Sequence, residues 1–259
     1  MTQFGTTKRV VISSDAEALA DAVAGRLLSR LARRSAEGKR SHVALAGGAI
    51  GTAVLRAAGA VSSGYDIDWS HVHFWWSDEV FASRTDDERH ERAARAALID
   101  RIDVPARNVH TIAAVEDVAE VDAAAAAYAA ELARFGDAIH PWPNFYVCFL
   151  GVGSDGHIAS LFPDRAEIQI TDRSVVPVRD APTPPTARIT LTRPVINSAQ
   201  CVWLVVSGTD KAAALGLALA GASYETVPAA GAKGRRRTLF FIDEAAAGGV
   251  PPELIDPEF

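Results

Sequence analysis

The sequence has little cysteine, no excess of positive charge and no long apolar run. Its 259 residues include 2 cysteines, Cys148 and Cys201, both in apolar runs, so we expect buried free thiols and no disulfide framework. A net charge of −6 without a sustained basic face disfavours binding to nucleic acid or to a membrane surface. The polar start, residues 1–9, lacks a signal-peptide core, and no run reaches the length of a membrane span. We therefore expect a cytoplasmic protein that binds neither nucleic acid nor membrane.

Internal repeats and low-complexity linkers are missing as well. The proline-rich stretch 180–185 is typical of a loop inside a domain, and the 7 histidines show no metal-ligand spacing. Apolar runs alternate with helical patterns along the whole chain, which predicts an α/β fold, a mostly parallel sheet with helices on both faces. We expect one domain over residues 1–259, with no metal and no cofactor.

The expected elements follow from apolar runs, helical spacing and capping residues. Strands are predicted near residues 8–12, 42–46, 72–76, 108–112, 145–150, 201–206 and 238–242. Helices are predicted near residues 16–34, 52–58, 85–98, 117–135 and 212–219, with short helical segments before Pro163 and after Asp243. The arginines in 26–34 and 235–237 are interpreted as solvated surface rather than as binding patches.

The most informative stretch is residues 144–163, NFYVCFLGVGSDGHIASLFP. An unbroken apolar strand empties into a loop with Gly151, Gly153 and Gly156, and open α/β sheets bind ligands at such strand ends. The spacing is also a literal G-x-G-x-x-G, but a nicotinamide site needs a long helix after the third glycine, and Pro163 stands too close. We therefore interpret the loop as a tight turn that presents backbone N–H groups and His157.

This stretch resembles the signature of the 6-phosphogluconolactonases, G-x-G-x-[DE]-G-H-x-x-S-L-F-P, at every fixed position. The related glucosamine-6-phosphate deaminases share a D-G-H-I-A core but continue with F-N-E-P, whereas this chain reads Ser-Leu-Phe-Pro over 160–163. The resemblance extends over nearly the whole chain. It implies a Rossmann-like fold of the sugar-phosphate isomerase and lactonase type.

Gly47 and Gly48 lie between a predicted strand and a predicted helix, the geometry that binds phosphate. A plain turn that needs glycine is the alternative. Lactonases of this type carry S-G-G-[ST] here, which favours phosphate. In this chain Ala46 and Ala49 flank the glycines, so the hydroxyls are missing and the backbone donors remain.

Asp78 and Glu79 follow the strand at 72–76 and match the family's G-D-E-R-F, with Val80 in place of the arginine. The change removes a bidentate phosphate partner. Arg89 and His90 stand where the family has S-N or R-N. We hypothesise that Arg89 replaces some of the missing charge and that His90 binds substrate.

Two cations further along the chain complete the predicted site. Arg188 opens R-I-T-L-T-R-P-V-I-N, which matches the family closely, and it is a candidate ligand for phosphate or carboxylate; a surface arginine is the alternative. Lys211 lies at the start of a helix, where a cation is unfavourable for the helix dipole, so an anionic ligand accounts for it better.

The predicted reaction is hydrolysis of 6-phospho-D-glucono-1,5-lactone to 6-phospho-D-gluconate in the oxidative pentose phosphate pathway. His157 is the candidate general base, Asp155 or Asp78 would orient it, and N–H groups of the 151–156 turn, including Gly153, would stabilise the oxyanion. The substrate-binding candidates are Gly47, Gly48, Glu79, Arg89, His90, Gly153, Arg188 and Lys211. A glucosamine-6-phosphate deaminase and a non-catalytic sugar-phosphate-binding protein are the alternatives, and we expect a monomer.

Overall fold

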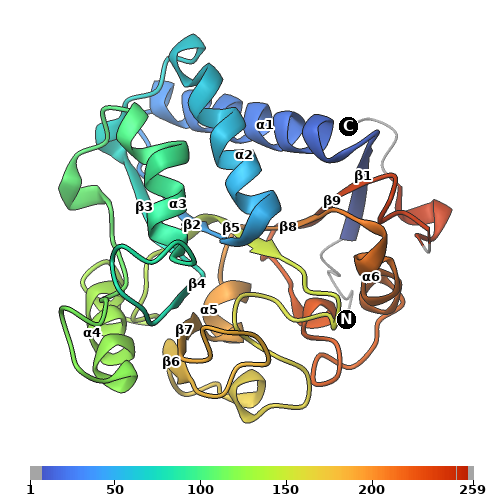
Figure 1. Cartoon of the computed structure of the whole chain (residues 1–259). Coiled ribbons are helices and arrows are strands. Elements are labelled where there is room, and N and C mark those ends of the chain that lie inside the picture. Colours follow the sequence, from blue (N-terminus) through green and yellow to red (C-terminus); the bar gives the residue numbers. More distant parts are fainter. Residues whose placement is uncertain (1–7, 249, 256–259) are drawn as a thin grey trace.

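A six-stranded sheet forms the centre of the computed structural model, which describes residues 8–248 and 250–255 (Figure 1). Every neighbouring pair of its strands is parallel. In spatial order the strands are β1 (Lys8–Ser13), β9 (Arg237–Asp243), β8 (Cys201–Val206), β5 (Phe145–Gly151), β2 (Ser41–Leu45) and β3 (Val72–Trp76). The predicted α/β class is confirmed.

Helices cover both faces of this sheet (Figure 1). One face carries α1 (Ala16–Ala36), α2 (Gly48–Val61) and α3 (His90–Ala97), and the other carries α4 (Val121–Ala133) and α5 (Arg193–Asn197); α6 (Ala212–Leu219) follows β8. Because both faces are covered, β3 and β8 are buried at every position, and Cys148 and Cys201 are buried free thiols as predicted. Within the described part of the chain, no helix combines the length and apolar character needed to cross a membrane.

Helix α1 shows how local sequence sets these elements. The Asp15 carboxylate accepts a hydrogen bond from the N–H of Ala18 at 2.8 Å and so caps the first turn. Apolar residues at helical spacing are buried against the sheet: Leu19, Val23, Leu27, Leu28 and Leu31. Arg33 and Arg34 lie in the last turn, where cations favour the helix dipole.

A second, antiparallel sheet of three strands lies on the face that carries α4 and α5 (Figure 1). Its strands are β4 (Asp78–Val80), β7 (Arg188–Leu191) and β6 (Val175–Val178), in that spatial order. Pairing of β4 with β7 sets Asp78 opposite Thr190 and Val80 opposite Arg188. This small sheet was not predicted from the sequence, and it brings two distant site segments together.

Two predicted helices are present with shorter bounds, and three further element predictions are wrong. The helix predicted for 85–98 begins at His90 after turns, and the helix predicted for 117–135 is shorter, spanning α4. In place of a strand at 108–112 there is a single bridge from Val109 to Phe74, and in place of a helix before Pro163 a bridge joins Ile158 to Leu161. Turns replace the helix after Asp243. Residues 1–7, most of the polar start, lie outside the described residues.

Candidate active site

The turn between β2 and α2 forms one wall of the site. Gly47 precedes α2 and offers no side-chain cap, so the first N–H groups of the helix face outward without a local acceptor. Gly48 has φ 78°, a conformation that favours glycine. Gly47 is required for another reason, since a Cβ at this position would come within 3.0 Å of the His90 ring. The turn therefore combines backbone donors with close contact to an imidazole.

The loop after β5 forms a closed turn that holds His157. The N–H of Gly153 donates to the carbonyl of His157 at 2.9 Å, and the N–H of Gly156 donates to the carbonyl of Gly153 at 3.0 Å. A Cβ on Gly153 would come within 3.0 Å of Nδ1 of His157. The Phe162 ring lies 4.7 Å from the imidazole, measured between centroids. Because Gly153 has no side chain, the His157 ring can pack directly against the backbone of the loop.

Asp155 sets the tautomer and the orientation of that imidazole. Its Oδ1 lies 2.6 Å from Nδ1 of His157 and accepts a hydrogen bond from the backbone N–H of the same residue at 3.0 Å. Burial alone would raise the pKa of the Asp155 carboxyl, but the hydrogen bonds and the charge of His157 outweigh it and lower that pKa. An ionised carboxylate can only accept, so Nδ1 carries a hydrogen, and in the neutral ring the lone pair is then on Nε2.

Asp78, the other candidate for orienting His157, contacts different groups. Its Oδ2 accepts a hydrogen bond from the hydroxyl of the buried Ser160 at 2.7 Å, and its Oδ1 lies 3.7 Å from Nδ1 of His90. Asp78 lines the site and joins the 157–163 loop to β4. Asp155 is therefore the carboxylate in contact with the predicted base.

Glu79 and Arg89 lie behind the site and do not line it. Glu79 is 0% exposed, and its carboxylate accepts hydrogen bonds at 2.8 Å from the N–H groups of His90 and Glu91, the first residues of α3. Arg89 is 1% exposed and donates to the carbonyl of Ile112 at 2.8 Å. It also pairs with Glu91 at 3.2 Å. Both side chains thus hold the segment that carries His90, and the buried Arg89 guanidinium is not part of the cavity lining.

His90 contributes a positive charge beside the Gly47 turn. Burial alone would lower its pKa, but the carboxylates of Asp78 and Glu79 outweigh burial and raise the pKa of His90 above its usual value. Nδ1 donates to the carbonyl of Asp78 at 2.9 Å. Asp78 and Glu79 thus favour the protonated form of the ring and act as its counter-charges.

Arg188 and Lys211 supply two further cations. Nε of Arg188 donates to the carbonyl of Pro185 at 3.0 Å, and its Nη2 reaches Thr183 at 3.1 Å, so the guanidinium is anchored by the proline-rich loop. Lys211 immediately precedes α6 and pairs with Asp210 at 2.8 Å. Both residues remain partly exposed to the cavity described next.

One cavity of about 550 Å³ unites these groups at the carboxyl ends of the parallel strands. Of the predicted site residues, those that line it are Gly47, Gly48, Asp78, His90, Gly153, His157, Arg188 and Lys211. Asp155 does not line the cavity but contacts His157, which does. Glu79 and Arg89 also lie outside the lining. The histidine, the glycine turn and the three cations therefore face one ligand space.

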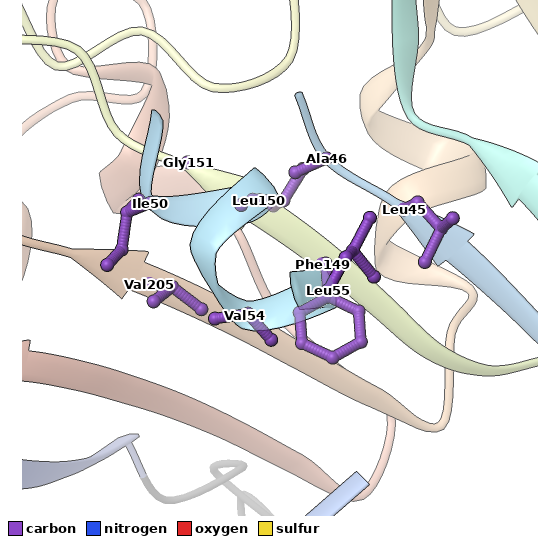
Figure 2. Close-up of a pocket in the computed structure, with 10 residues that line it drawn as sticks. Leu45, Ala46, Ile50, Val54, Leu55, Phe149, Leu150, Gly151 and Val205 are labelled. Carbon is purple, nitrogen blue, oxygen red and sulfur yellow. The ribbon is translucent and has the colours of Figure 1, made fainter. Parts of the chain in front are cut away.

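A small apolar gap between α2 and the sheet adjoins this cavity (Figure 2). Figure 2 shows Val54 and Leu55 of α2 close to Phe149 and Val205 of the sheet. The gap measures about 10 Å³, which is too small for a sugar. The ligand space is thus the adjoining cavity, which shares Ala46, Ile50 and Gly151 with the gap.

Sequence reasoning gave no role to Ser160, Thr190 or Ser207. Ser160 is fully buried and its hydroxyl donates to Asp78; its N–H donates to the Thr190 hydroxyl at 3.2 Å. Ser207 lines the cavity and donates to Asp243 at 2.6 Å. Ser160 is a fixed residue of the family signature, which was the available signal. Within the described residues, no three His, Cys, Asp or Glu side chains gather as metal ligands would.

These features define an α/β protein with a cavity suited to a phosphorylated ligand, and comparison with known proteins agrees. Residues 14–241 match the family described as glucosamine-6-phosphate isomerases/6-phosphogluconolactonase. The chain belongs to this family.

Similar proteins cover nearly the whole chain. A 6-phosphogluconolactonase of Mycobacterium leprae is 43% identical over 93% of this chain and 98% of its own. One of Streptomyces coelicolor is 41% identical over 97% of this chain and 98% of its own. The solved 6-phosphogluconolactonase of Trypanosoma brucei superposes with a TM-score of 0.82 over 95% of this chain and 100% of its own, at 21% identity, and so supports the fold.

Proposed function

We propose that this protein hydrolyses 6-phospho-D-glucono-1,5-lactone to 6-phospho-D-gluconate, the lactonase step of the oxidative pentose phosphate pathway. The two bacterial relatives above carry the name of this activity at 41% and 43% identity. The observation that carries the proposal is the shared cavity, in which the His157–Asp155 pair and three cations meet. A base and an anion-binding end in one space are what a phosphorylated lactone requires.

His157 acts as the general base in this proposal. Its Nε2 removes a proton from water as the water oxygen attacks the lactone carbonyl carbon. When the tetrahedral intermediate collapses, the bond from that carbon to the ring oxygen breaks. The ring oxygen then takes the proton back from His157 and becomes a hydroxyl, and the new carboxylic acid releases its remaining proton to solvent and becomes a carboxylate. Asp155 is a positioning residue that keeps Nδ1 protonated and the ring in place.

Only some of the backbone N–H groups of the 151–156 turn can stabilise the oxyanion. The N–H groups of Gly153 and Gly156 donate within the turn itself, and the N–H of His157 donates to Asp155. These donors are engaged in shaping the loop. The remaining amides of the turn and the nearby cations are left to receive the developing negative charge.

The phosphate end is assigned to the Gly47–Gly48 turn together with His90, Arg188 and Lys211. Backbone N–H groups at a helix start and charged side chains are both strong phosphate donors. His90 supplies a cation on this wall, although Val80 has removed the family's arginine. Arg89 and Glu79 act indirectly, by holding the start of α3.

A direct assay tests the proposal and its rivals. Fresh 6-phosphogluconolactone is followed with and without protein, and spontaneous opening is subtracted; we expect clear acceleration. Ammonia release from glucosamine 6-phosphate would instead identify a deaminase. Binding of 6-phosphogluconate with no acceleration of lactone opening would identify a non-catalytic binding protein. The cytoplasmic location, the monomeric state and the single domain stay predictions.

A further inference from the structure

Two arginine runs that the sequence indicated as solvated surface meet in space. Arg30, Arg33 and Arg34 of α1 and Arg236 and Arg237 at the start of β9 line one hollow of about 400 Å³. We call it the basic hollow. Its floor includes Tyr146 and Cys201, near the starts of β5 and β8. Because the strands are parallel, their amino ends lie together, and the basic hollow at these ends is opposite the candidate active site at the carboxyl ends.

The five arginines and Lys39 in the lining of the basic hollow outnumber its carboxylate, Glu37, which partly offsets the charge of Arg33 and Arg34. Glu37 is the acidic side chain in its lining, and its carboxylate pairs with Lys39 at 2.7 Å. Among the described residues, no carboxylate forms an ion pair with any of the five arginines. Such clustering of like charges is unfavourable for folding and stands out in a chain of net charge −6. An anionic ligand would remove that repulsion.

Aromatic faces and neutral groups hold two of the guanidinium groups in place. The Arg34 guanidinium carbon lies 4.2 Å from the Tyr146 ring centroid, and its Nε donates to the Ser41 hydroxyl at 2.8 Å. The Arg30 guanidinium carbon lies 5.6 Å from the Trp203 ring centroid. Stacked guanidinium groups keep their charge and their outward N–H donors. The hollow is thus ordered in advance, which lowers the entropy cost of binding.

We propose that the basic hollow binds a small molecule that carries phosphate groups. The arginine fork matches phosphate oxygens in a bidentate manner, and arginines from two segments can hold separate phosphates. The concave shape and the volume of about 400 Å³ suit a small molecule. The net negative charge of the chain disfavours an extended polyanion such as nucleic acid.

Calorimetry with inorganic pyrophosphate at about 0.15 M salt tests this proposal. The double variant Arg33→Gln/Arg236→Gln removes two exposed cations that have no side-chain hydrogen bond among the described contacts, so the fold should be retained. The matched control, Arg56→Gln/Arg173→Gln, makes the same change in net charge at exposed positions outside the hollow. A third protein, Arg188→Gln/Lys211→Gln, weakens the candidate active site instead.

We expect pyrophosphate to bind the wild type saturably. The Kd for pyrophosphate should be at least about tenfold higher in Arg33→Gln/Arg236→Gln. The control and Arg188→Gln/Lys211→Gln should keep this binding, and lactone hydrolysis by Arg33→Gln/Arg236→Gln should equal wild type. No saturable binding, equal loss in the control, or loss confined to Arg188→Gln/Lys211→Gln would overturn the proposal. Binding to phosphatidylglycerol vesicles without binding to pyrophosphate would also overturn it, because a lipid surface would then be the ligand.

Discussion

Replacing Gly153 by alanine should separate the position of the base from its presence. The new Cβ would come within 3.0 Å of Nδ1 of His157 and near Oδ1 of Asp155. That Cβ position is more than 1 Å short of an ordinary contact distance of about 3.5 Å, so the ring must move by at least about 1 Å. That movement breaks the 2.6 Å contact with Asp155. Since a misplacement of about 1 Å costs about 100-fold in rate, kcat for lactone hydrolysis should fall by about that factor.

The assay is steady-state lactone hydrolysis, corrected for spontaneous opening, with binding of 6-phosphogluconate measured in parallel. Binding should change little, because the cations of the cavity are untouched. Gly151→Ala is the matched control from the same loop: its Cβ would meet nothing within 4 Å, so it should lose far less turnover. If Gly153→Ala hydrolysed lactone as fast as the wild type, the claim that this glycine sets the base would be refuted.

Three further predictions concern charge. Below the raised pKa of His90, the wild type should bind 6-phosphogluconate about tenfold more tightly than His90→Asn. This difference in affinity should vanish as pH rises through that pKa, because the ring loses its charge. Calorimetry across a pH range measures it. Arg89→Met should lower the free energy of unfolding by about 3 kcal/mol in urea melts, because Glu79 and Glu91 lose their buried partner; unchanged stability would contradict its structural role. Burial, with help from the charge on His110, lowers the pKa of His73 to about 4, so its stabilising effect is present above about pH 6.5 and is lost as pH falls towards 4. Between pH 6 and 5, His73→Asn should therefore lose stability less steeply than the wild type, by about 1 kcal/mol per pH unit, and parallel slopes would argue against it.

The strands of the main sheet could be predicted because burial on both faces leaves a plain mark on the sequence. Phe145–Gly151 and Cys201–Val206 are nearly continuous apolar runs, and both are strands of the six-stranded sheet. The three-residue strand β4, in contrast, carries two carboxylates and has no such pattern. Its pairing with β7 depends on a contact more than one hundred residues away, which local patterns do not encode.

The start of α3 shows why helix boundaries failed. The predicted helix began near Thr85, where acidic residues resemble a capping segment. In the structure the carboxylate of Glu79, in strand β4, caps α3 by accepting hydrogen bonds from the N–H groups of His90 and Glu91. This cap is a tertiary contact. No local signal at 85–89 could place the first turn at His90.

The parts of the candidate site formed by glycine turns could be predicted from the sequence. The parts that depend on the direction of a long side chain could not. The glycine loop, His157 and the Gly47 turn were found from spacing and resemblance, and they line one cavity. Arg89 had been a candidate for the missing charge, yet its guanidinium points to the carbonyl of Ile112 and is buried. Sequence names a cation but not the direction of its side chain.

The most direct test of the account is the turnover of His157→Gln with fresh 6-phosphogluconolactone, measured beside its affinity for 6-phosphogluconate. If the imidazole on the 151–157 turn takes the proton from water, kcat should fall by about 10²–10⁴-fold while product affinity stays near that of the wild type. Turnover close to wild type would contradict it, whatever else the cavity binds.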